Sequence, residues 1–324
     1  MSLPDLAAIR SAAELVHRHL KPTPEIAWPL LAERLGAKVV VKHENHTPIG
    51  AFKVRGGLTY MDRLRSEHPD VDGVITATRG NHGQSVALAA AKFGCTATIY
   101  IPKGNSREKN AAMRAFGATL VEEGHDFQAC YEACMARAEA EHLHLLPSFH
   151  PALIAGVATY SFEFLSGAPD LDVVYVPIGL GSGICGMIAA RDALGHKTDV
   201  VGVVSTEANA YALSFEAGKP VSTNSADTMA DGMACRVPVG DAVAAINAGA
   251  ARIVQVTDAE IKAAMRAYYT DCHQLAEGAG AAPLAAAIQE RAANVGKVVG
   301  LVLSGGNIDM PVYQQVLAEG LGPA

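Results

Sequence analysis

The sequence predicts an α/β protein with two open, mainly parallel, twisted sheets flanked by helices. Two series of short apolar segments alternate with segments of helical periodicity, one over 71–141 and one from Pro151 onward. Such alternation is typical of parallel sheets joined by right-handed crossovers. The chain has 324 residues, half of them hydrophobic. This length predicts a large core and either two domains or one domain with an insertion.

Apolar periodicity and breaker residues set the expected elements in order. The N-terminal part is expected to form helices over 5–20, 27–35 and 56–66 and a strand over 38–42. The first series should hold strands over 74–77, 96–101 and 118–121, and helices over 83–93, 106–116 and 127–141. The second should hold strands over 173–176, 200–204, 253–256 and 298–303, and helices over 154–165, 184–194, 206–217, 258–272, 281–292 and 310–319. The connection 218–240 is long enough to indicate a functional loop.

Charge and composition exclude several classes of partner. The net charge is −7 and there is no basic block, so neither nucleic acid nor an anionic membrane is a predicted partner. The start of the chain lacks a basic segment followed by an apolar one, and no apolar run is long enough to span a bilayer. We therefore expect a cytoplasmic protein, with its six cysteines as buried thiols rather than disulfides or metal ligands.

One lysine stands at the junction of a strand and a helix. The segment after the strand over 38–42 breaks at Pro48 and Gly50, and it then presents Lys53 directly behind Phe52. A lysine beside an aromatic ring in such a place is a candidate nucleophile for Schiff-base chemistry. Taken alone, however, this segment fits a solvated lysine better.

Three further loops follow expected strands and are unusually small or polar. The loop 78–84, Thr-Arg-Gly-Asn-His-Gly-Gln, precedes a helix and suits a carboxylate, although a tight turn with an N-cap asparagine explains it better when it stands alone. The loop 179–183, Gly-Leu-Gly-Ser-Gly, suits an anion held by main-chain N–H groups. It matches neither the dinucleotide nor the nucleoside-triphosphate fingerprint. The loop 304–307, Ser-Gly-Gly-Asn, follows the last strand.

These four loops together meet the needs of pyridoxal 5′-phosphate. Its aldehyde requires a lysine, its phosphate requires an anion cradle, and its ring nitrogen requires one partner. The four loops all follow strands, and the carboxyl ends of parallel strands are where such sites open. We therefore predict pyridoxal phosphate as the cofactor.

The same loops resemble the motifs of the fold-type II pyridoxal-phosphate enzymes, specifically the serine/threonine dehydratase and serine racemase group. Residues 50–56 resemble SFKxRG, residues 80–84 match GNHGQ, and residues 304–307 match SGGN. The loop 179–183 lies where that family has its phosphate cradle. The resemblance covers essentially the whole chain and implies a fold similar to the tryptophan synthase β chain.

The resemblance also implies a role for each loop. Lys53 would bind the cofactor covalently, with Phe52 beside it, Asn81 would bond the ring oxygen, and Ser304 would face the ring nitrogen. The phosphate would be held by Gly179, Leu180, Gly181, Ser182 and Gly183. The substrate, through its carboxylate, would be held by Thr78, Arg79, Gly80, Asn81 and His82. Glu277 opens a segment that resembles the family's EGAG turn near the ring, for which a structural role is expected.

The chain departs from the family pattern at informative positions. Ala51 replaces a serine, and Arg79 stands where the racemases have a serine that acts as the second acid/base. In metal-dependent relatives a carboxylate follows the strand-end glutamate six residues on, whereas Glu207 is followed by Leu213. No metal site is therefore predicted.

The predicted function is a pyridoxal-phosphate-dependent dehydratase, or ammonia-lyase. It would eliminate water from a 3-hydroxy amino acid of the threonine or serine type, with 3-hydroxyaspartate and phenylserine as further candidates. The products would be a 2-oxo acid and ammonia. A racemase or β-replacement enzyme of the same fold is the alternative, and a non-catalytic metabolite-binding protein a weaker one. The large domain is expected at 1–69 and 151–324 and the small one at 70–150, in a homodimer that binds an amino-acid substrate.

Overall fold

Two sheets organise the chain in the computed structural model, which describes residues 1–125 and 127–319. The larger sheet has the strand order β1-β2-β10-β7-β8-β9 and the smaller the order β5-β4-β3-β6. The larger holds β1 (Glu25–Ala27), β2 (Lys38–His43), β7 (Val173–Pro177), β8 (Asp199–Ser205), β9 (Arg252–Val256) and β10 (Val298–Leu303). The smaller holds β3 (Gly73–Ala77), β4 (Thr96–Ile101), β5 (Thr119–Glu122) and β6 (His144–Leu145). Every pairing is parallel except β1 with β2, which confirms the predicted fold class.

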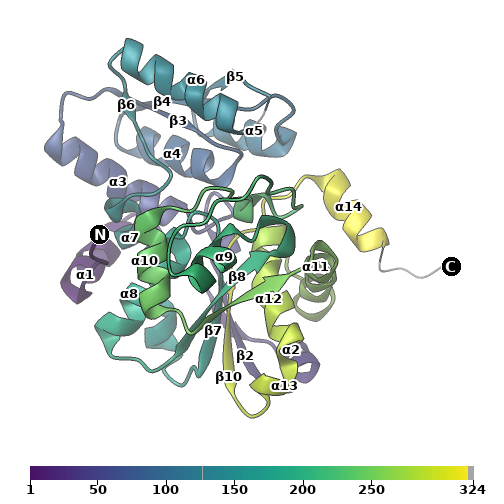
Figure 1. The fold of residues 1–324 in the computed structure, drawn as a ribbon. Coiled ribbons are helices and arrows are strands. Elements are labelled where there is room, and N and C mark those ends of the chain that lie inside the picture. The colour runs from purple at the N-terminus through teal and green to yellow at the C-terminus, as the bar shows by residue number, and fades with distance from the viewer. Residues whose placement is uncertain (126, 320–324) are drawn as a thin grey trace.

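Helices cover both faces of the larger sheet. The helices of the N-terminal and smaller-sheet parts are α1 (Leu6–His17), α2 (Pro29–Leu35), α3 (Val54–Glu67), α4 (Asn81–Lys92), α5 (Arg107–Ala115) and α6 (Phe127–Ala140). Those that follow are α7 (Pro151–Gly167), α8 (Ser182–Leu194), α9 (Ala210–Ala217), α10 (Gly240–Gly249), α11 (Asp258–Cys272), α12 (Gly278–Gln289), α13 (Arg291–Asn294) and α14 (Met310–Ala318). Helix α12 crosses the central strands, with α2 and α11 packed beside it, while α7, α8 and α10 pack together with α8 on β7 and β8. Figure 1 shows the smaller sheet with α4, α5 and α6 at the top of the view, above the larger sheet.

The centre of the larger sheet is an apolar layer between helices. Residues 299–303 of β10 and residues 173–176 of β7 are buried throughout, as expected for parallel strands covered on both faces. Helix α3 connects the two parts of the molecule, because it packs against both α4 and α7. The path of the chain from the larger sheet to the smaller one thus runs through the helix that begins just after Lys53.

Three short elements differ from the sequence-based expectation. Strand β1 was not expected, because it follows two prolines and pairs only with the edge of β2. Strand β6 was not expected either, since it contains only two residues. The helix predicted over 206–217 is divided into a 3-10 turn, Thr206–Ala208, and α9, with Asn209 between them.

The predicted small domain, residues 70–150, contains all four strands of the smaller sheet. Its boundaries as a domain stay a prediction. Within the described part of the chain, no helix is both long enough and apolar enough to cross a membrane. All six cysteine side chains are buried.

Candidate active site

Lys53 lies directly before α3, after a turn over residues 47–51 that is closed by its own hydrogen bonds. Gly50 has a φ of 66°, a left-handed conformation that favours glycine. The Thr47 hydroxyl donates to the Ala51 carbonyl over 2.8 Å and accepts from the Ala51 N–H over 3.0 Å. The turn is therefore closed on itself just before Lys53.

The Lys53 turn is joined to the Ser304 loop through the backbone. The Phe52 N–H donates to the Ser304 carbonyl over 3.0 Å, and the Gly306 N–H donates to the Gly50 carbonyl over 2.9 Å. An antiparallel bridge joins Ala51 to Gly305 between these two bonds. Two loops some 250 residues apart in the chain thus form one small backbone unit, as expected of loops at the carboxyl ends of the adjacent strands β2 and β10.

The Lys53 amine is half-buried and has a lowered pKa. Burial lowers the pKa of Lys53 from 10.5 to about 8, while the nearby Glu277 carboxylate opposes the change. The amine lies 5.1 Å from the centre of the Phe52 ring. The Lys53 carbonyl accepts a hydrogen bond from the Ser85 hydroxyl over 2.7 Å, which ties it to α4. A larger fraction of this lysine is therefore unprotonated near neutral pH than of a lysine in water.

The loop 179–183 presents a row of backbone donors. None of the N–H groups from Gly179 to Gly183 meets an acceptor within the described part of the chain. Gly181 is the N-cap residue of α8, and Ser182 and Gly183 are its first two residues. Gly181 has a φ of 99°, and a Cβ there would lie 2.8 Å from that of Ala242. A Cβ at Gly183 would lie 3.8 Å from Cζ of Phe52, which places the loop beside the Lys53 turn. Such a helix N-terminus suits a phosphate.

Asn81 connects the smaller-sheet part to the Ser304 loop. Its Oδ1 accepts from Asn307 Nδ2 over 2.8 Å, and its Nδ2 donates to Glu277 Oε1 over 2.7 Å. The Asn307 amide also donates to the Ile49 carbonyl over 2.7 Å. One amide N–H of Asn81 stays available to a ligand.

Two titratable side chains beside Asn81 have strongly shifted pKa values. Burial and the neighbouring Lys53 charge lower the pKa of His82 to about 3, so its ring is neutral at physiological pH. Burial raises the pKa of Glu277 to about 7, against the opposing effect of Lys109. Nε2 of His82 and Oε2 of Glu277 are buried without a hydrogen-bond partner among the described residues. Unpartnered buried polar atoms of this kind are expected where a ligand supplies the partner.

A buried network of ion pairs centred on Arg55 holds the first turn of α3, directly after Lys53. The Arg55 guanidinium, fully buried, bonds both oxygens of Glu44 and both oxygens of Glu163 over 2.6–2.9 Å. Lys42 bonds Glu163 as well, over 2.7 Å. Although burial alone raises it, the pKa of Glu163 falls to about 2 because of Arg55 and Lys42. The first turn of α3 is therefore anchored by charge-assisted bonds two residues after Lys53.

Arg79 is exposed and makes no hydrogen bond or ion pair with the described residues. Its neighbour Thr78 is buried and accepts from the Gly80 N–H over 3.0 Å, which closes the turn in front of Asn81. Among the described residues no three His, Cys, Asp or Glu side chains are grouped so that they could hold a metal ion.

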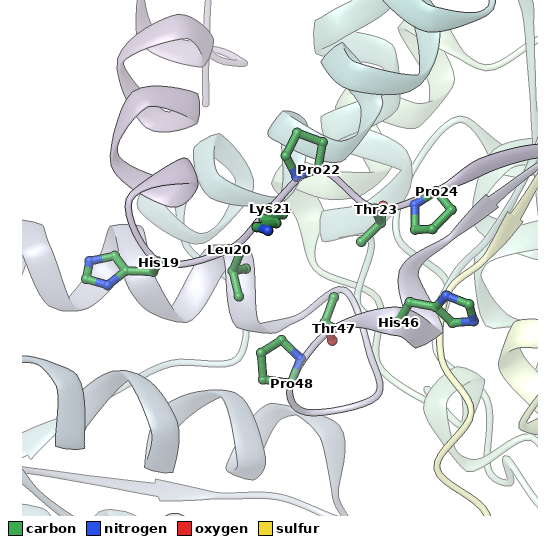
Figure 2. A pocket seen from close by; sticks show the side chains of 9 residues that line it. All are labelled: His19, Leu20, Lys21, Pro22, Thr23, Pro24, His46, Thr47 and Pro48. Carbon is green, nitrogen blue, oxygen red and sulfur yellow. The ribbon is translucent and has the colours of Figure 1, made fainter.

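A separate pocket of about 230 Å³ lies beside the Lys53 turn, where residues 19–24 approach residues 46–48 (Figure 2). It is lined by His19, Leu20, Lys21, Pro22, Thr23, Pro24, His46, Thr47 and Pro48. None of these residues was predicted to belong to the site.

Comparison with known proteins identifies the family. Residues 16–305 match the family model described as "Pyridoxal-phosphate dependent enzyme". The chain belongs to this family. It is 34% identical to an L-threonine ammonia-lyase of Geobacter sulfurreducens, over 97% of this chain and 78% of that protein. It is 31% identical to an L-threo-3-hydroxyaspartate ammonia-lyase of Saccharomyces cerevisiae, over 98% of both chains.

The fold agrees with solved structures of the same kind. The processed form of threonine deaminase isoform 2 from Solanum lycopersicum superposes with a TM-score of 0.90, at 28% identity, over 98% of this chain and 95% of that one. The resemblance to the pyridoxal-phosphate-dependent dehydratases and the predicted cofactor are thereby confirmed.

The site residues of this pyridoxal-phosphate dependent enzyme fit the cofactor. The unpartnered N–H groups of residues 179–183 suit its phosphate, and the Lys53 amine suits its aldehyde. The Ser304 side chain is buried, and its hydroxyl bonds nothing within the described residues, so it has a hydrogen bond to offer a ring nitrogen. The individual roles of these residues stay predictions.

Two residues beside the site of this family member were not predicted from the sequence. Lys109 was not singled out, and Glu277 was given only a structural role, yet both lie against Asn81 or its neighbours. A signal for Lys109 was present, because it lies one turn before the buried Met113, on the apolar face of α5. A lysine on such a face requires a buried partner.

Proposed function

We propose that this enzyme is an ammonia-lyase that eliminates water from 3-hydroxy amino acids and yields a 2-oxo acid and ammonia. The observation that carries the proposal is the position of Lys53: its turn is bonded to the Ser304 loop, its carbonyl to α4, and its neighbour Phe52 lies beside the glycine loop. An amine of lowered pKa therefore lies beside the loops that we propose to bind the cofactor.

The bound cofactor would supply an aldehyde for the substrate amine and a conjugated ring that delocalises the negative charge left at Cα. Backbone N–H groups of residues 179–183 would hold the phosphate. The Ser304 hydroxyl would bond the ring nitrogen. A hydroxyl is a weaker acid than a pyridinium, so the ring nitrogen would stay unprotonated. An unprotonated ring withdraws fewer electrons and would hold the negative charge at Cα only briefly, which favours prompt loss of the β-hydroxyl.

Lys53 would act as the general base. With the substrate amine held by the cofactor, the free Lys53 amine would take the proton from Cα. The Cβ–O bond would then break, and the hydroxyl would leave as water with one proton, which balances the proton taken from Cα. The lowered pKa, about 8, favours this role because it increases the unprotonated fraction near neutral pH. The resulting enamine leaves the site and is hydrolysed to the 2-oxo acid and ammonia.

Arg79 disfavours racemisation as the main activity. A racemase requires a second group that exchanges a proton with Cα from the opposite side, and a guanidinium stays charged at every accessible pH. Arg79 is instead suited to a second acidic group of a substrate such as 3-hydroxyaspartate, or to stacking on the ring of phenylserine. We propose these two, beside threonine and serine, as the substrates to compare.

The decisive experiment is a substrate screen by ammonia release. L-Threonine, L-serine, both diastereomers of 3-hydroxyaspartate, and phenylserine are incubated with the enzyme, with Lys53→Ala as the inactive control. At least one is expected to give stoichiometric 2-oxo acid and ammonia. Absence of oxo acid from all of them, or recovery of substrate with inverted chirality at Cα, would reject the proposal.

We further propose a homodimer located in the cytoplasm, following the resemblance to the dehydratase group. Light scattering on the purified protein tests the first point. A mass of twice 33.7 kDa is expected.

A further inference from the structure

Lys109 extends from the smaller-sheet part of the molecule to two carboxylates of the larger. It lies in the first turn of α5, and its side chain is only 6% exposed. Its Nζ is 2.6 Å from Asp231 Oδ2 and 3.8 Å from Glu277 Oε2. Asp231 belongs to the connection 218–240, and Glu277 directly precedes α12.

The stem of Lys109 also packs against the loop that carries Asn81. A Cβ at Gly80 would lie 2.4 Å from Cδ of Lys109, so the lysine stem occupies the space that a side chain at position 80 would need. The next residue, Asn81, donates to Glu277 over 2.7 Å. Asn81 and Lys109 therefore approach the two oxygens of the same carboxyl group.

We propose that Lys109 is a positioning residue that holds the Thr78–Asn81 loop against Asp231 and Glu277 and so fixes the Asn81 amide in the site. Its role in catalysis depends on the function proposed above, because Asn81 and Glu277 matter to the reaction only at that site. Its contacts can be measured without any substrate.

Charge complementarity supports this assignment. Although burial alone lowers it, the pKa of Lys109 is raised by the carboxylates of Glu277, Asp231 and Asp309. In turn, Lys109 is the strongest influence that keeps Glu277 ionised against its burial, and Lys53 adds a smaller one. A neutral residue at 109 would leave the buried Glu277 carboxylate and the partly exposed Asp231 carboxylate with a weaker compensating charge.

Two further hydrogen bonds join the start of α5 to the residues around the start of α14. The Met310 N–H at the start of α14 donates to Glu108 Oε1 over 2.8 Å, and the Ser106 hydroxyl bonds Asp309. The first of these contacts is exposed, and the second is part-buried like that of Lys109. Neither joins two opposite charges, whereas the Lys109 contact does, and ion-paired hydrogen bonds are the stronger kind.

The test compares Lys109→Met, Asp231→Asn and the double variant with Lys103→Met, all loaded with cofactor and without substrate. Methionine keeps the stem over Gly80 and removes the charge, and Lys103 is an exposed lysine in the loop before α5. Hydrogen exchange of residues 78–84 and of α5 is expected to accelerate at least about tenfold in the first two variants, because a buried partner is lost. The double variant should accelerate exchange no more than the stronger single one, since both disrupt one contact.

A second readout separates positioning from general loss of structure. KM for the substrate is expected to rise about tenfold in Lys109→Met with a smaller change in kcat, because the loop that would hold the substrate carboxylate is no longer fixed. Exchange in the β7 and β10 segments should not change. Unaltered exchange at 78–84, additive effects in the double variant, or an unchanged KM in an active variant would each overturn the proposal. If no substrate of the screen reacts, the exchange result still decides whether Lys109 holds the loop.

Discussion

Replacing Lys53 by methionine is expected to stabilise the cofactor-free protein while abolishing its activity. The amine is half-buried, and among the described residues the nearby opposite charge that acts on it is the Glu277 carboxylate. Methionine has a similar length and no charge, so it fills the same space without the cost of a partly desolvated ammonium group. The functional residue thus lowers the stability of the empty fold.

The size of the effect follows from the two proton affinities. The pKa of Lys53 is about 8 in the folded protein and 10.5 in an unfolded chain. A tenfold difference in proton affinity corresponds to about 1.4 kcal/mol, so below about pH 8 the folded state carries a penalty of roughly 3 kcal/mol. Between these values the unfolded chain binds more protons, so wild-type stability rises with pH and the penalty falls to about 1 kcal/mol near pH 9.5.

The assay is urea unfolding of the cofactor-free wild type, Lys53→Met and Lys103→Met. The advantage of Lys53→Met over wild type should be about 2 kcal/mol larger near pH 7 than near pH 9.5. The exposed Lys103 variant corrects for general effects of removing one positive charge, and it should show no such change with pH.

Two results would refute this reasoning. If Lys53→Met and the wild type unfold at the same urea concentration near pH 7, Lys53 carries no desolvation penalty. If the variant is more stable by the same amount at both pH values, the gain comes from apolar packing and the pKa of Lys53 is not lowered.

Three further substitutions test other parts of the site. Gly181→Ala places a Cβ at a φ of 99° and 2.8 Å from a neighbour, so cofactor affinity should fall at least about tenfold in a titration, whereas Gly195→Ala, at the far end of α8 with open space around it, should leave affinity unchanged. Arg55→Met leaves two buried glutamates without their main cation and should lower the free energy of unfolding by about 3–5 kcal/mol in urea, against less than about 1 kcal/mol for Arg63→Met, whose ion pair is exposed. Arg79→Ser should change the ratio of kcat/KM between 3-hydroxyaspartate and serine by about tenfold or more and cofactor affinity by less than about twofold; equal loss on all substrates would contradict it.

The sequence predicted the long elements because their local signals agree with their tertiary environment. Strand β10, Val298–Leu303, is an uninterrupted apolar run and was predicted with both ends correct. Helix α11 was predicted at both ends too, since Thr257 and Glu260 form a capping box and His273 ends the helix with a φ of 52°. Strand β1 carries no such signal, because its place depends on pairing with β2.

The sequence motifs predicted the loops of the site, but they did not predict the contacts that join those loops. The Lys53 and Ser304 loops were both found, yet the backbone bridge between Ala51 and Gly305 depends on β2 and β10 being neighbours, which local periodicity does not encode. The ion pair of Lys109 with Asp231 joins residues 122 positions apart, and although the apolar face of α5 indicates a partner for Lys109, nothing local says which residue it is. Contacts of this kind become visible only when the folded chain brings the two residues together.

The two halves of the site differ in how firmly they are held. Lys53 is fixed by a backbone bridge on one side and by the buried Arg55 network on the other. The loop of Asn81 reaches the same place through side-chain bonds to Glu277 and Asn307 and through the ion pair of Lys109. Backbone bridges and buried guanidinium pairs open less readily than a few side-chain contacts across two parts of a molecule. We therefore infer that the base stays fixed while the substrate-carboxylate loop is the part able to open for entry and release, and that Lys109 sets how often it does so.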